Sequence, residues 1–120
     1  MQEISPQRKA LFNIMIAIVD YGVGNLFSLK SSLEMIGAES VVTSDPDVIR
    51  KADKILLPGV GAFEDARAKL KNSGLDTVVC NEVKQGKKLL GICLGMQMLF
   101  EESDEVRLCK GLGLLPGRIE

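Results

Sequence analysis

Apolar and polar positions along the chain switch between two periods, and the switches predict alternating strands and helices. Short runs rich in Ile, Val and Leu suit strands that are buried on both faces of a parallel sheet. Between these runs, apolar residues recur three or four positions apart, which is typical of helices with one buried face. The predicted strands are 15–20, 39–43, 53–57 and 89–92, and residues 111–120 suit a turn that enters a new strand.

The intervening segments carry helix start and stop residues. Leu26, Leu29 and Leu33 mark one helix, which Gly37 ends. Asp45 and Pro46 open a short helix through about residue 51. Two helices follow, one from residue 63 to an end near residues 72–74 and one from residue 75 to an end at Gly86, and a helix-prone stretch runs from residue 93 to 100.

This β-α-β-α-β-α-α-β-α order predicts a three-layer α/β fold, with a mostly parallel sheet and helices on both faces. In such sheets the functional loops lie at the carboxyl ends of the strands. Residues 21–25, residues 58–61 and Cys93 all follow predicted strands. We therefore expect these three segments to meet at one edge of the sheet.

Composition limits the protein to a small set of classes. The 120 residues suit one domain, which we place at 15–120, with 1–14 as an extension outside the fold. Fifteen basic and sixteen acidic residues give a net charge of −1, which predicts no nucleic-acid partner, and no apolar run is long enough to span a membrane. Three cysteines and no histidine favour a reducing cytoplasm and predict no disulfide, metal or cofactor.

The segment Gly91-Ile92-Cys93-Leu94-Gly95 has the spacing of a nucleophile elbow with cysteine as the nucleophile. A strand ends, the nucleophile occupies a strained turn, and a helix begins at once. A side chain at either flanking glycine would crowd this turn, and the helix N-terminus would favour a thiolate. A free cysteine is more often a small core residue, which is how we interpret Cys80 and Cys109.

Three other features leave two interpretations open on spacing alone. Residues 58–61, Pro-Gly-Val-Gly, form either a plain turn or a loop that offers N–H groups to an oxyanion. Gln97 lies one helical turn after Cys93 as either an exposed amide or a substrate contact. Gly22-x-Gly24 suggests a dinucleotide-binding turn, but Phe27 stands where the third glycine of that motif belongs.

Four segments together resemble the class I, triad-type glutamine amidotransferases. The elbow is shared by all of them, whereas the Asp-Tyr-Gly-x-Gly-Asn and Pro-Gly-Val-Gly-Ala-Phe segments are most like the glutaminase subunit of imidazole glycerol phosphate synthase. The resemblance covers residues 15–120 and implies the N-terminal part of such a subunit. The matching segments are 18–26, 57–63, 91–97 and 111–115.

The resemblance implies a role for each matched residue. Cys93 would attack the side-chain amide of L-glutamine and form a thioester, and the N–H groups of Leu94 and Val60 would form the oxyanion hole. The loop is expected to need a peptide rearrangement before the Val60 N–H points inward. Released ammonia would pass to a (β/α)₈-barrel cyclase subunit. The residues implied to hold glutamine are Gly59, Gly61 and Gln97, and Asn25 is implied to lie near the cyclase interface.

The family also needs a histidine base and a glutamate on a later His-x-Glu segment, and the chain contains no histidine. We therefore expect a truncated domain with little glutaminase activity alone, and with exposed apolar faces and a sheet edge. Two alternatives remain open. One is another Cys-elbow protein, such as a pyridoxal-synthase glutaminase or a PfpI-like hydrolase, and the other is an inactive subunit that only docks on a cyclase.

Overall fold

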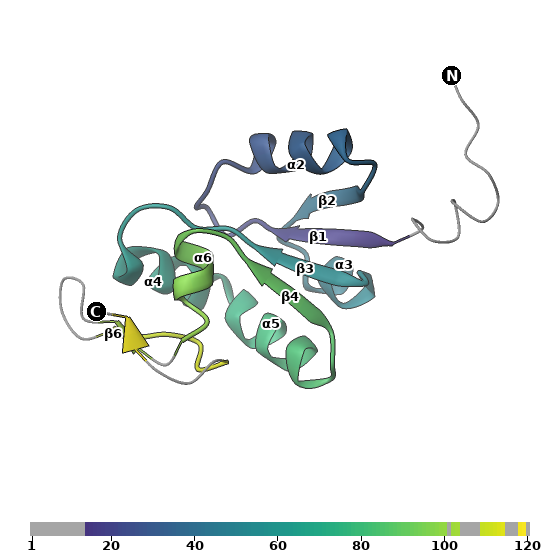
Figure 1. The fold of residues 1–120 in the computed structure, drawn as a ribbon. Coiled ribbons are helices and arrows are strands. Elements are labelled where there is room, and N and C mark those ends of the chain that lie inside the picture. Colours follow the sequence, from purple (N-terminus) through teal and green to yellow (C-terminus); the bar gives the residue numbers. More distant parts are fainter. Residues whose placement is uncertain (1–13, 101, 104–108, 115–117, 120) are drawn as a thin grey trace, which may run out of the picture.

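A four-stranded parallel sheet forms the centre of the molecule (Figure 1). The structure, a computed structural model, describes residues 14–100, 102–103, 109–114 and 118–119. The strand order is β2-β1-β3-β4, so the chain adds β2 on one side of β1 and then β3 and β4 on the other. The strands are β1 (Met15–Val19), β2 (Glu39–Thr43), β3 (Lys54–Leu57) and β4 (Lys88–Gly91).

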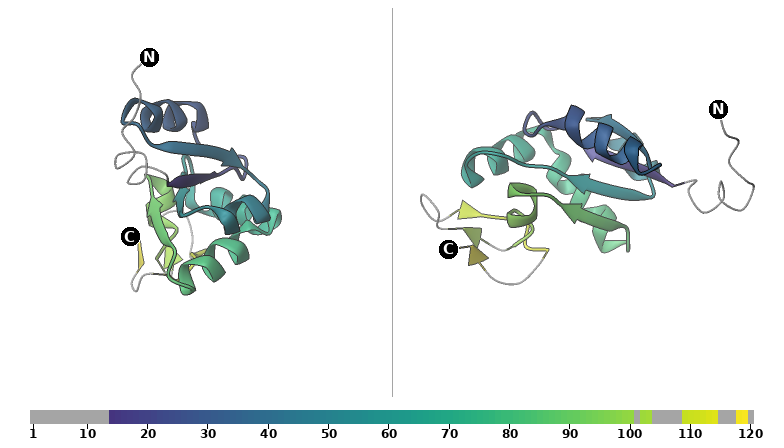
Figure 2. Two further views of the ribbon diagram at one scale, coloured as in Figure 1. Left: turned by 90° about the vertical axis from the view of Figure 1, so that its right-hand side faces the viewer. Right: turned by 45° about the horizontal axis from the view of Figure 1, so that its top comes forward.

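Helices cover both faces of this sheet. Figures 1 and 2 show α2 on one face and α3, α4 and α5 on the other. This arrangement follows from right-handed crossovers, because the direction of chain travel across the sheet reverses after β2. The predicted α/β architecture is therefore confirmed. The helices are α2 (Leu26–Met35), α3 (Pro46–Lys51), α4 (Phe63–Ser73), α5 (Leu75–Lys84) and α6 (Leu94–Gln97).

The last of these helices is shorter than the sequence predicts. The helix-prone stretch extends to Phe100, but α6 ends at Gln97. The Leu99 and Phe100 N–H groups donate to carbonyls three residues back, those of Met96 at 3.1 Å and Gln97 at 3.3 Å, so the last turn is tighter than an α-helix. The carbonyls of Met98 and Phe100 then accept hydrogen bonds from the Leu112 N–H at 2.8 Å and the Gly113 N–H at 3.0 Å, which tie this turn to later backbone.

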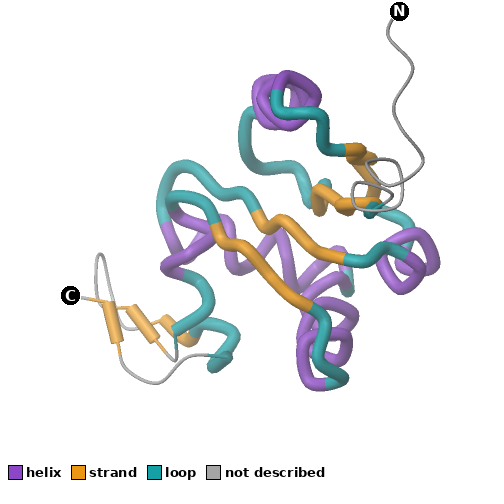
Figure 3. Tube along the Cα trace, turned by 45° about the vertical axis from the view of Figure 1, so that its right-hand side comes forward, coloured by secondary structure: helices purple, strands orange, loops and turns teal. Residues whose placement is uncertain are grey.

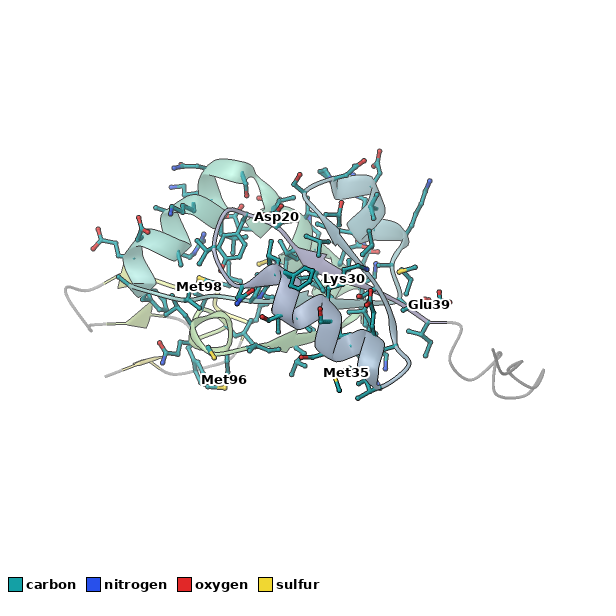
Figure 4. All side chains as sticks on the ribbon, turned by 90° about the horizontal axis from the view of Figure 1, so that it is seen from above. Asp20, Lys30, Met35, Glu39, Met96 and Met98 are labelled. Atoms are coloured by element: carbon teal, nitrogen blue, oxygen red, sulfur yellow. The ribbon has the colours of Figure 1, made fainter. Side chains whose placement is uncertain are left out.

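The two faces of the sheet are buried to different degrees. Against α3, α4 and α5, the strands contribute to one apolar cluster that includes fully buried Leu57, Phe63 and Leu70. On the opposite face Ile18 and Leu56 are register partners and are buried, but α2 itself has no buried residue. The side chain of Met35 at the last turn of α2 is 88% exposed (Figure 4). The expected exposed apolar surface is present on this side.

Lys87 fixes the amino end of β4 to two helices. Its ammonium lies 2.9 Å from the carbonyl oxygen of Ile49, 2.7 Å from that of Arg50 and 2.9 Å from Oε1 of Glu82. These carbonyls belong to the last turn of α3, where a cation also meets the negative end of the helix dipole. The Lys87 and Glu82 side chains are 13% and 11% exposed, so the pair is largely removed from water.

A second, three-stranded sheet follows the elbow region, in the order β6-β5-β7. Its last strand lies within residues 111–120, where the sequence predicts a turn that enters a new strand. The side chain of Cys109 and residues 1–13, most of the predicted extension, lie outside what the structure describes. Among the described residues no helix is long and apolar enough to cross a membrane. The strands are β5 (Glu102–Ser103), β6 (Cys109–Lys110) and β7 (Arg118–Ile119).

Candidate active site

Cys93 occupies the strained turn that the sequence predicts. Its φ of 55° and ψ of −123° make it the one non-glycine residue with positive φ in the described part of the chain. Strand β4 ends two residues earlier and α6 begins at the next residue. The Ile92 N–H donates to the Leu57 carbonyl at 3.0 Å, which holds the strand side of the turn. The Cys93 side chain is exposed and its thiol is free, as a nucleophile requires.

The two flanking glycines are needed because backbone comes too close for a side chain. A Cβ on Gly91 would lie 2.6 Å from Cα of Met96, and a Cβ on Gly95 would overlap the carbonyl oxygen of Leu57. The predicted crowding at both positions is therefore confirmed. The neighbour at Gly95 is the end of β3, so the elbow and the adjacent strand are packed backbone to backbone.

The loop after β3 lies directly against the elbow, as predicted (Figures 1 and 3). A Cβ on Gly59 would lie 2.7 Å from the Gly95 nitrogen. The Leu94 N–H donates to the carbonyl of Gly59 at 3.2 Å. One of the two N–H groups assigned to the oxyanion hole is thus already bonded within the chain, and Val60 is 56% exposed. The oxyanion roles of Leu94 and Val60 stay predictions.

A pocket of about 190 Å³ opens beside Cys93. Its walls come from the elbow, from the loop after β3 and from the first turns of α2, so three segments far apart in sequence meet there. Four of the seven predicted site residues line it, whereas Gly61, Leu94 and Gln97 do not. The lining residues are Gly24, Asn25, Ser28, Leu29, Ser32, Pro58, Gly59, Val60, Ile92 and Cys93.

The α2 wall of the pocket was not predicted. Asn25 caps the helix, since its Oδ1 accepts a hydrogen bond from the Ser28 N–H at 3.2 Å. Asn25, Leu29 and Ser32 are spaced four and three residues apart, so they share one helical face. Leu29 is one of the apolar positions that predict this helix, whereas the polar Ser32 has no signal in the hydrophobic pattern.

Tyr21 is a second residue at the site to which the sequence assigns no role. It is 6% exposed, and its hydroxyl donates a hydrogen bond to the carbonyl of Pro58 at the start of the loop. Burial raises the pKa of the Tyr21 phenol above its ordinary value, which already lies well above neutral pH, so the hydroxyl is a hydrogen-bond donor. The residue after β1 therefore reaches across to the residue after β3.

Cys80 differs from Cys93 in both exposure and chemistry. It lies on α5, is partly buried and is not among the pocket residues. Burial raises the pKa of the Cys80 thiol, and the nearby Asp76 carboxylate raises it further. The thiolate fraction of Cys80 at neutral pH is therefore smaller than that of an exposed cysteine with the ordinary pKa.

Known proteins share both the sequence and the fold. The HisH subunit of imidazole glycerol phosphate synthase from Bacillus cereus (strain G9842) is 54% identical over 105 residues, which are 88% of this chain and 50% of that protein. The corresponding subunit from Bacillus subtilis (strain 168) is 48% identical over 104 residues, 87% of this chain and 49% of that protein. The chain thus spans about half the length of the curated relatives it matches.

Two solved structures have the same fold at low sequence identity. A glutamine amidotransferase crystal structure superposes with a TM-score of 0.71 at 21% identity, covering 85% of this chain and 54% of that one. A putative peptidase E from Listeria monocytogenes EGD-e gives 0.67 at 18% identity, covering 88% and 64%. Residues 15–120 match the CobB/CobQ-like glutamine amidotransferase domain family. The elbow, its neighbouring loop and this match agree, and the chain belongs to the glutamine amidotransferase family.

Proposed function

We propose that this chain carries the nucleophile and the oxyanion loop of the glutaminase subunit of a cytoplasmic imidazole glycerol phosphate synthase. The observation that carries the proposal is the exposed Cys93 in a strained elbow, at the mouth of a pocket walled by the loop after β3. The HisH relatives support the choice of synthase. L-Glutamine is the substrate that the resemblance implies for this pocket.

The reaction begins with attack of the Cys93 sulfur on the side-chain amide carbon of glutamine. The carbon–sulfur bond forms as the carbonyl electrons move to oxygen, and the nitrogen leaves as ammonia after it gains a proton. Water then cleaves the thioester to glutamate. The chain has no histidine, so the base and acid for these proton transfers come from outside these 120 residues.

The developing oxyanion needs two N–H groups, and the hydrogen bond from Leu94 to Gly59 occupies one of them. We propose that the Gly59–Val60 peptide turns over during activation. This rotation would remove the Gly59 carbonyl from Leu94 and turn the Val60 N–H toward the pocket. Val60 is exposed and Gly61 has open space around it, so the outer half of the loop has room to move. Gly59, Gly61 and Gln97 would then hold the substrate.

Exposed apolar side chains follow the strand ends at the same edge of the sheet. Phe27, Val60 and Met96 follow the ends of β1, β3 and β4, and they are 82%, 56% and 50% exposed. Large apolar side chains at this exposure mark interaction surfaces when they gather around a site. We propose that the cyclase subunit covers this edge, with Asn25 near the contact, and receives the ammonia there.

A covalent label tests the proposed chemistry. We expect a diazoketone analogue of glutamine to modify Cys93 and not Cys80, because Cys80 is partly buried and its pKa is raised. Excess glutamine should slow the labelling, while excess asparagine should not. The measurement is mass spectrometry of proteolytic peptides, with Cys93→Ala as the control for site.

Two results would overturn the proposal. Labelling of Cys93 that glutamine does not slow would indicate a different Cys-elbow hydrolase, and absence of label on an alkylatable Cys93 would indicate an inactive docking subunit. Ammonia release from glutamine by the chain alone, at rates typical of the family, would contradict the need for an outside base.

A further inference from the structure

The loop after β3 is held at one end and free at the other. Pro58 has a fully buried side chain, and its carbonyl accepts the hydrogen bond from the Tyr21 hydroxyl. The next carbonyl, that of Gly59, accepts the backbone bond from the Leu94 N–H at 3.2 Å, and no side chain in the described part of the chain donates to it. Val60 and Gly61 are exposed. The loop is therefore held by contacts at Pro58 and has fewer contacts at Val60 and Gly61.

Tyr21 is itself rigidly placed. The Asp20 N–H donates to the Thr43 carbonyl at 2.9 Å, and the Gly22 N–H donates to Oδ1 of Asp20 at 3.3 Å. The ring of Tyr21 belongs to the main apolar cluster. A Cβ on Gly24 would lie 3.1 Å from Cβ of Pro58, so the loop after β1 also packs on the proline. The hydroxyl of Tyr21 thus has a fixed position beside Pro58.

From this geometry we propose that Tyr21 is a positioning residue for the oxyanion loop. Its hydroxyl holds the Pro58–Gly59 peptide still, so rotation is confined to the next peptide, Gly59–Val60. Without that anchor, both peptides would move together, and the Val60 N–H would sample many directions. The catalytic meaning of this anchor rests on the proposed function, whereas the anchor itself is a property of the fold.

The phenol is suited to this task at neutral pH. A tyrosine hydroxyl already keeps its proton at neutral pH, and burial raises the pKa of Tyr21 further, so the Pro58 carbonyl retains its donor across the physiological range. A buried carbonyl that loses its donor is unsatisfied, which gives the loop a reason to shift when the hydroxyl is removed. Tyr21→Phe makes that change and keeps the ring in the core.

Amide hydrogen exchange measured by NMR tests the anchor without any need for activity. In Tyr21→Phe we expect the Leu94 amide, bonded to Gly59, to exchange about tenfold faster or more. The Ile92 amide, bonded to the Leu57 carbonyl, is the internal reference and should change less than about twofold. A general loss of stability would speed both amides equally. Lys87→Met, which weakens the fold at the other end of β4, provides that comparison.

A second measurement connects the anchor to the chemistry. Tyr21→Phe should slow diazoketone labelling of Cys93 about fivefold or more, because that reaction needs the analogue carbonyl polarised. Alkylation of Cys93 by iodoacetamide needs no oxyanion hole, so its rate should be the same in Tyr21→Phe as in the parent chain. Equal changes at Leu94 and Ile92, or unchanged diazoketone labelling, would overturn the inference. If the parent chain takes no label, the proposed function fails, and the exchange comparison still decides whether Tyr21 holds the loop.

Discussion

At the scale of single residues, the chain stores conformational strain at Cys93. A non-glycine residue at a φ of 55° and a ψ of −123° lies in backbone space that only glycine occupies freely. The surrounding hydrogen bonds hold it there, including those from Ile92 to Leu57 and from Leu94 to Gly59. The nucleophile is therefore held in its exposed position at the expense of stability.

Two substitutions of Cys93 measure this strain. Alanine keeps the Cβ and its strain, while glycine removes both, so we expect Cys93→Gly to be more stable than Cys93→Ala by about 1 kcal/mol. At an unstrained exposed position the order is reversed, because glycine has a more disordered unfolded state. Urea unfolding of both variants provides the comparison. Equal stabilities, or a more stable alanine variant, would show that the turn carries no strain.

Residue roles differ in how far the sequence could reveal them. The roles of Cys93, Gly91 and Gly95 were predictable from their spacing. A sharp turn between a strand and a helix leaves no room for a side chain at the two positions that flank the nucleophile. Tyr21 and the bond from Leu94 to Gly59 were not, because they depend on the direction in which loop carbonyls point. Hydrophobic pattern and residue spacing contain no information about that direction.

At the scale of elements, Lys87 connects β4 to α3 and α5. We expect Lys87→Met to lower the free energy of unfolding by about 3 kcal/mol, because two helix carbonyls lose a donor and Glu82 is left largely buried without its cation. Thermal and urea unfolding measure the loss. The double variant Lys87→Met with Glu82→Leu should recover part of it, since no unpaired carboxylate remains. A double variant no more stable than the single one would contradict this account.

Element boundaries were predictable wherever local preference and packing agree. The strand at 39–43 matches β2 fully, and the predicted strand at 89–92 is displaced by one residue from β4. Helix α6 shows the limit, because its apolar sequence favours a longer helix than the fold permits. Leu99 and Phe100 bond three residues back in a tighter turn, and the carbonyls of Met98 and Phe100 bond to Leu112 and Gly113, contacts that local sequence does not reveal.

At the scale of the whole molecule, the sheet has an exposed apolar margin. Leu90 is the register partner of Leu56 on the edge strand β4 and is 59% exposed. Edge strands with exposed apolar side chains pair with other chains. The described structure thus agrees with the expected open edge, and the edge strand is β4 itself, which leads into the elbow.

A charge at this edge should keep chains apart. We expect Leu90→Lys to reduce concentration-dependent self-association of the chain in sedimentation velocity, with a change in unfolding free energy of about 0.5 kcal/mol or less. Met35→Lys is the matched control, because Met35 is 88% exposed on α2 and lies on no edge strand. An equal effect of both substitutions would indicate non-specific association through exposed apolar side chains. A parent chain that is monomeric at all concentrations would show that the edge strand does not mediate self-association.

The close approach of Gly59 and Gly95 has a consequence for how this site can vary. The geometry around Cys93 is set where two main chains touch with no side chain between them. The sequence specifies this contact through the absence of a side chain at Gly59 and Gly95. Core side chains on either side can be exchanged over generations without displacing the nucleophile, provided that the glycines stay. To build the site into another parallel sheet, a designer would have to reproduce the distance between these two backbone segments. A search template that contains only the reactive side chains would miss this requirement.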